Sequence, residues 1–152
     1  MDTQNPVTQL STADTLKFMS EQSLGRLAVS INNSPDIFPV NYVVHARTND
    51  DVVAYIRASA GNKLFATAVG SPLALETDLV ETETETATSA ILYGTARQVQ
   101  HPDELQLVES TGLTAWIADH KPDVIAIDVD RISGRTFKLG PAPDNPITET
   151  PD

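Results

Sequence analysis

The sequence predicts a mainly β (α+β) protein: a small antiparallel barrel of six strands with two or three short helices at its openings. Segments of alternating apolar and polar residues recur along the chain, and only two or three segments carry helical spacing. Most of the strand-like segments follow one another through short turns, which favours antiparallel pairing. The length of 152 residues, with 40% hydrophobic residues, suits one domain with one sizeable core.

Helical patterns occur in three segments. Residues 11–25 begin with Ser11 and have Asp14 three positions later, which is a helix start of the capping-box kind. Gly25 can end this helix. The other two helices are predicted at residues 62–70, which close with a glycine, and at residues 101–112, which have a proline in the first turn.

Six segments have the composition of β-strands. In residues 26–31 the apolar side chains fall on one side, and the turn NNSPD follows. The ETETETAT stretch fits a solvated hairpin tip, because it lacks the ligand spacing and central glycine of a calcium loop. The last strand is apolar in both phases, so the sequence does not show which of its two faces is buried. The other strands are predicted at residues 37–46, 51–59, 73–80, 89–99 and 123–132.

The C-terminal residues differ in composition from the rest of the chain. Residues 140–152 are acidic, rich in proline and without periodicity, which is typical of a disordered tail. We therefore divide the chain into a folded domain, residues 1–139, and this tail.

Composition excludes several classes of function. Ten basic residues are scattered among 21 acidic ones and the formal net charge is −11, so we expect neither nucleic acid nor a membrane as a partner. The chain has no cysteine, no apolar run of membrane-spanning length and no export signal at its start, so we expect a cytoplasmic protein. The histidines lack metal-ligand spacing and no nucleophile motif is present, so we expect no metal site and assign no catalytic residue.

The stretch YIRASAGNKLFATAVG, residues 55–70, points to an anion site. A strand ends near Arg57, and a helix is predicted to start near Lys63. Backbone N–H groups at a helix start are unsatisfied and carry partial positive charge, and Gly61 allows close approach of a ligand. Ser59 and Asn62 add side-chain donors, so the stretch can hold a phosphate. The alternative is that the two cations pair with surplus surface carboxylates.

Six short motifs together resemble a known family. The motifs GRLAV, PVNYVV, R-x-x-x-G-x-K-L, LALETD, GTARQV and ISGR come in the order seen in pyridoxamine 5′-phosphate oxidase-like flavin-binding proteins. The resemblance covers residues 11–137 and implies a split β-barrel that binds FMN between the two subunits of a homodimer. By this resemblance the phosphate is held at Arg57, Ser59, Asn62 and Lys63. Ala58 belongs to the same cofactor-binding stretch and stands where many relatives carry threonine. The isoalloxazine ring would lie along Pro39, Val40, Asn41 and Tyr42, largely against backbone groups.

The function that follows from the resemblance is a flavin-dependent oxidoreductase that acts on a small molecule of open identity. A deazaflavin coenzyme could replace FMN. The sequence also allows a non-catalytic flavin- or haem-binding carrier or sensor, and a barrel that only mediates association. We expect a homodimer because the apolar strands leave more face than two short helices can cover.

Overall fold

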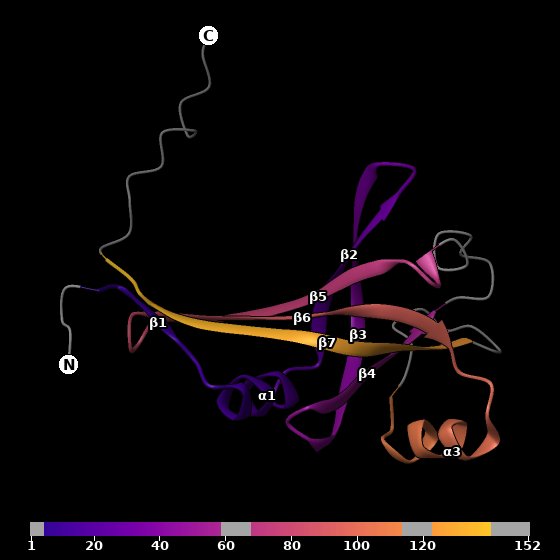
Figure 1. The fold of residues 1–152 in the computed structure, drawn as a ribbon. Helices are drawn as coiled ribbons and strands as arrows, with labels where there is room; N and C mark the ends of the chain where they lie inside the picture. Colours follow the sequence, from indigo (N-terminus) through magenta and orange to yellow (C-terminus); the bar gives the residue numbers. More distant parts are fainter. Residues whose placement is uncertain (1–4, 59–67, 114–122, 141–152) are drawn as a thin grey trace, which may run out of the picture.

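The computed structural model describes residues 5–58, 68–113 and 123–140, and its strands form one antiparallel sheet. The strand order is β1-β7-β4-β3-β2-β5-β6, and pairing between β6 and β7 closes β2 to β7 into a ring (Figure 1). The predicted six-stranded antiparallel barrel is thus confirmed, and the short strand β1 adds to the edge of β7. The elements are β1 (Val7–Gln9), α1 (Thr12–Ser20), β2 (Leu24–Ile31), β3 (Ser34–Thr48), β4 (Asp51–Ala58), β5 (Pro72–Glu81), β6 (Thr86–Gln98), α3 (Pro102–Ser110) and β7 (Asp123–Lys138).

Tight hairpins set the register of the barrel. Asn32 and Asn33 connect β2 to β3 with φ angles of 51° and 63°. Positive φ at two successive turn residues is the geometry that matches the twist of a hairpin, and asparagine tolerates it well. The acidic Glu/Thr stretch forms the exposed tip between β5 and β6, as predicted.

A packed apolar core fills the barrel. Leu27, Leu75, Leu92 and Ile127 are at most 1% exposed and belong to one cluster contributed by the ring strands. A small barrel of this size is filled by its own side chains, so a site for the expected cofactor lies outside its interior.

Helix α1 lies over one end of this core. Its buried residues include Met19, which is fully buried. A side chain at Gly134 of β7 would clash with Thr15, so the helix approaches the strand closely because glycine stands there.

Helix α3 covers a second, smaller core on the outside of the barrel. Tyr55 of β4, Val108 of α3 and Ala126 of β7 belong to this cluster. Residues 124–127 are therefore all buried, with alternate side chains facing the barrel interior and the underside of α3. Both phases of the last strand are apolar because both of its faces are covered.

The ends of the helices test the predicted caps. The Asp14 N–H donates to Ser11 Oγ at 3.1 Å, as the capping pattern predicts. The prediction that Gly25 ends α1 is wrong: the helix ends at Ser20 and Gly25 lies in β2. A Cβ at Gly25 would come within 2.8 Å of the Glu76 carbonyl oxygen, so this glycine serves close strand packing.

The remaining predicted segments are described to different extents. Helix α3 has Pro102 in its first turn, as predicted. The predicted helix at residues 62–70 falls mostly outside the described residues, although Gly70 has the positive φ of a helix end, 88°. Of the tail, only residue 140 is described. No helix in the described part of the chain is long and apolar enough to cross a membrane.

Candidate functional site

Strand β3 changes partner in the middle of the PVNYVV motif. Asn41 pairs with Leu24 of β2, whereas the next residue, Tyr42, pairs with Ile56 of β4. Strands β3 and β4 therefore diverge at this point, which we call the fork: residues 39–42 of β3 and residues 56–58 of β4. The fork brings the two halves of the predicted cofactor site together, since the segment expected to hold the phosphate begins where β4 ends.

The predicted ring-contacting residues sit differently at the fork. Pro39 is exposed, Asn41 is half-buried and Val40 is 8% exposed. Tyr42 is 2% exposed, and its hydroxyl donates to the Met19 carbonyl at 2.6 Å. Burial raises the pKa of Tyr42 to about 12. Its ring is therefore part of the core, and its N–H donates to the Ser23 carbonyl at 3.1 Å, so neither the ring nor the N–H is available to a ligand at the fork.

Arg57 is turned toward α3. Its Nε donates to the Leu113 carbonyl at 2.6 Å and its Nη2 to Glu109 Oε2 at 3.1 Å. Its side chain is only 14% exposed. Ala58 ends β4, and Ser59, Asn62 and Lys63 lie outside the described residues. One of the two predicted cations thus has a carboxylate partner, although that carboxylate is 80% exposed.

A network that the sequence did not reveal fixes the other end of α3. Arg97 of β6 holds Glu104 with both Nη atoms, at 2.7 and 2.8 Å, and its Nε donates to Asp128 at 2.7 Å. The Tyr55 hydroxyl donates to Glu104 at 2.8 Å. Hydrogen bonds from Arg97 lower the pKa of Glu104 to about 2, and burial raises the pKa of Tyr55 to about 12. Tyr55 belongs to β4, Arg97 to β6 and Asp128 to β7, so no local sequence pattern links these residues to Glu104 of α3.

This network borders a cavity of about 460 Å³ between the β3–β4 hairpin and α3. His45 and His101 also line it. Both arginines of the lining, Arg47 and Arg97, are already paired with carboxylates. The cavity therefore offers no uncommitted arginine for an anion.

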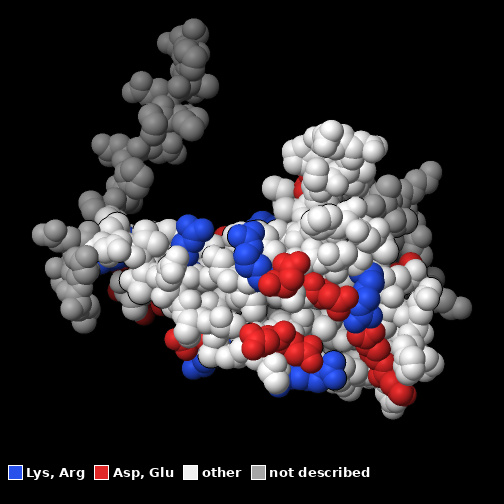
Figure 2. Space-filling view, viewed as in Figure 1, with Lys and Arg blue, Asp and Glu red and all other residues white. Residues whose placement is uncertain are grey.

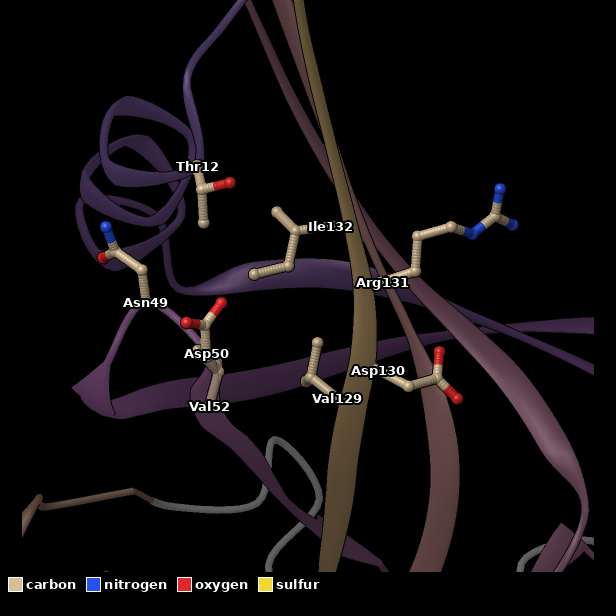
Figure 3. Close-up of a pocket in the computed structure, with 8 residues that line it drawn as sticks. All are labelled: Thr12, Asn49, Asp50, Val52, Val129, Asp130, Arg131 and Ile132. Atoms are coloured by element: carbon tan, nitrogen blue, oxygen red, sulfur yellow. The ribbon is translucent and has the colours of Figure 1, made fainter.

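A smaller cavity of about 210 Å³ lies between α1, the β3–β4 turn and β7. Figure 3 shows Thr12, Asn49 and Asp50 along one side and Arg131 pointing away from them. Arg131 instead lies 3.8 Å above the centre of the Tyr93 ring. In the described part of the chain no three acidic or histidine side chains are grouped to hold a metal ion.

Charged side chains of both signs alternate over the barrel. Figure 2 shows arginines and lysines next to aspartates and glutamates, while the protruding end of the β2–β3 hairpin is nearly free of charge on this face. A continuous basic surface, which a nucleic-acid backbone would need, is not seen on this face.

Known proteins match both the sequence and the fold. Residues 11–136 match the model of a family described as pyridoxamine 5′-phosphate oxidase. A solved protein from Corynebacterium glutamicum, provisionally named as such an oxidase, is 31% identical, with a TM-score of 0.75 over 92% of this chain and 98% of its own. A conserved protein of unknown function from Corynebacterium diphtheriae is 32% identical, with a TM-score of 0.75 over 88% and 99%.

A third similar structure is the FAD-binding protein from Mycobacterium smegmatis. It is 28% identical, with a TM-score of 0.76 over 88% of this chain and all of its own. No functionally curated protein matched the sequence. The matched span agrees with the order of motifs that predicted a split barrel, and the chain belongs to the pyridoxamine 5′-phosphate oxidase family.

Proposed function

We propose that this protein binds a flavin, specifically FMN, and acts as a flavin-dependent oxidoreductase on a small molecule. The observation that carries the proposal is the fork, where the PVNYVV segment meets the end of β4. The similar Mycobacterium smegmatis protein, named for binding FAD, supports a flavin more than any other cofactor class.

The proposed site divides between ring and phosphate. The backbone of Pro39, Val40, Asn41 and Tyr42 lines the ring, and the phosphate donors come from Arg57, Ser59, Asn62 and Lys63, with Ala58 in the same stretch. A bound flavin would supply the redox chemistry, while the protein binds and orients it. At the fork the Tyr42 ring is committed to the core and its N–H to the Ser23 carbonyl, so the Tyr42 side chain takes no part in this division.

A non-catalytic carrier or sensor of flavin or haem is the second candidate. It is favoured by one observation: in the most extensive polar network of the described residues, around Arg97, each charged side chain is already hydrogen-bonded to another member. The absorption spectrum of the purified protein also distinguishes a bound deazaflavin coenzyme from FMN.

The purified protein tests the proposal directly. We expect a yellow protein with a flavin absorption spectrum, and release of FMN on denaturation. Reduction of the bound cofactor by NADH, NADPH or a reduced deazaflavin, followed by turnover of an acceptor, would identify an enzyme. Reduction without turnover would identify a carrier, and a colourless protein that takes up neither FMN nor FAD would exclude flavin binding.

We further propose a homodimer formed through one partly exposed face of the barrel. We call it the outer face, and define it by the outward side chains of neighbouring strands: Arg26, Ala28, Ile37, Ala74, Glu76, Asp78, Tyr93 and Arg131. Register places Ile37, Ala28, Ala74 and Tyr93 in one row across four strands. In the described structure Ala28 and Ile37 of this row are exposed, and Ala74 and Tyr93 are half-buried.

Charge makes this face the favourable one for a second copy. Two molecules of formal charge −11 repel each other. On the outer face, Arg26 bonds Glu76 at 2.8 Å and Asp78 at 2.7 Å, and Arg131 lies over Tyr93. The two arginines and two carboxylates of the face cancel, so face-to-face approach avoids most of the repulsion. Ile37, with 64% of its surface exposed, supplies apolar area at its edge.

Sedimentation at micromolar concentration should show a dimer, whose interface would bury on the order of 2,000 Å². Ile37→Asp should weaken dimerisation at least about tenfold, because it places two carboxylates in an apolar contact. Leu105→Asp is the matched control, since Leu105 is exposed on α3, away from the outer face. A monomeric wild type, or equal effects of the two substitutions, would contradict this interface.

A further inference from the structure

The guanidinium of Arg57 has two edges, and α3 occupies one of them. Nε and Nη2 form the side edge, which donates to the Leu113 carbonyl and to Glu109. The end edge, formed by Nη1 and the second N–H of Nη2, donates to none of the described residues. A planar guanidinium can bind a partner at each edge because its five donors point in fixed directions.

The bond to α3 is well placed to hold the helix. Leu113 lies three residues beyond the last residue of α3, so a bond to its carbonyl fixes the chain directly after the helix. Leu113 is 6% exposed and belongs to the same buried cluster as Val108 and Val124. Arg57 therefore anchors the C-terminal end of α3 to the barrel, as Arg97 anchors its N-terminal end.

Arg97 shows that this chain uses an arginine as a two-edged bridge. Its Nε donates to Asp128 of β7, and its two Nη atoms hold Glu104 of α3. Arg57 uses Nε and Nη2 of its side edge for Leu113 and Glu109, and its end edge donates to no residue in the described part of the chain. Arg57 is also the last residue but one of β4, directly before the stretch to which we assign the flavin phosphate.

We propose that Arg57 is a bridging residue that couples the docking of α3 to the binding of the flavin phosphate. Helix α3 fixes the guanidinium through its side edge, so the end edge is already oriented for a phosphate oxygen. The coupling is reciprocal: a phosphate that holds Arg57 also stabilises the docked helix. Lysine, a single point charge on a flexible stem, cannot serve both partners. This inference rests on the proposed flavin binding.

Amide hydrogen exchange over residues 105–113 of the full-length protein tests the coupling. Without ligand, Arg57→Lys should exchange at least about tenfold faster than wild type in this segment, since it loses a charge-assisted bond. Glu109→Gln is the matched control and should change exchange by no more than about fivefold, because it removes only an exposed ion pair. Saturating FMN should slow exchange of the segment in the wild type, and riboflavin, which lacks the phosphate, should slow it much less.

The decisive comparison is Arg57→Lys at saturating FMN. We expect the variant, once loaded at high FMN concentration, to show no FMN-dependent slowing over residues 105–113. Equal slowing by FMN and riboflavin in the wild type, or unchanged slowing in the variant, would overturn the coupling. If the wild type bound no flavin, the proposed function and the coupling would both fail, and the ligand-free comparison would still decide whether Arg57 anchors α3.

Discussion

Replacing Lys63 with alanine should weaken FMN binding by about one to two orders of magnitude. A charge-assisted hydrogen bond to phosphate contributes roughly 1.5–3 kcal/mol, which corresponds to that loss of affinity. The local cation matters more here than in a neutral protein, because a phosphate ester approaches a molecule of formal charge −11. Fluorescence titration of the apoprotein with FMN measures the effect.

Two controls separate a phosphate contact from a general change in charge. Riboflavin should bind the wild type more weakly than FMN and should respond little to the Lys63 change. Lys17→Ala removes the same charge from the exposed last turn of α1 and should leave FMN affinity within about threefold, as expected of a distant, screened charge. Equal affinity of wild type for FMN and riboflavin would return Lys63 to the role of an ordinary surface charge.

Leu92→Ala should destabilise the fold by about 2–5 kcal/mol, the usual cost of a cavity left by a buried leucine. Leu92 is fully buried in the barrel interior, among side chains contributed by the ring strands. Its neighbours are held by strand pairing on both sides, so they can close little of the cavity. Urea unfolding followed by circular dichroism measures the loss.

The same variant tests where the cofactor lies. Because the proposed site is at the fork and not in the barrel interior, FMN affinity of folded Leu92→Ala should stay within about threefold of wild type, as expected for distant sites. Leu105→Ala, at a 37% exposed position of α3, should cost less than about 1 kcal/mol. A loss of stability below that level in Leu92→Ala would show that the interior is not closely packed.

Local sequence patterns were sufficient for the elements of the barrel. Alternation placed the ring strands, and the Asn32–Asn33 turn and the Ser11 cap followed from residue chemistry that acts within a few positions. The order of short motifs predicted the split barrel, which the family match confirms. These features could be predicted because each depends on residues that lie close together in the sequence.

The candidate site could be predicted from the sequence only in part. PVNYVV and the end of β4 were predicted to serve one cofactor, and the partner change of β3 brings them together. The role of the Tyr42 side chain was not predictable, because its acceptor is a carbonyl 23 residues away in α1. The α3 partners of Arg57 lie more than 50 residues along the chain, and the Arg97 network joins β4, β6, β7 and α3.

The sequence by itself determined which residues alternate, where the chain turns and which family's motif order it follows. Tertiary structure decided that Gly25 belongs to a strand, that both faces of residues 124–127 are covered and that Arg57 faces α3. The physical reason is the range of the interactions. A strand or a cap depends on bonds and side chains a few residues apart, whereas the partner of a buried strand face or of an arginine is chosen by the packing of segments that meet only when the barrel closes.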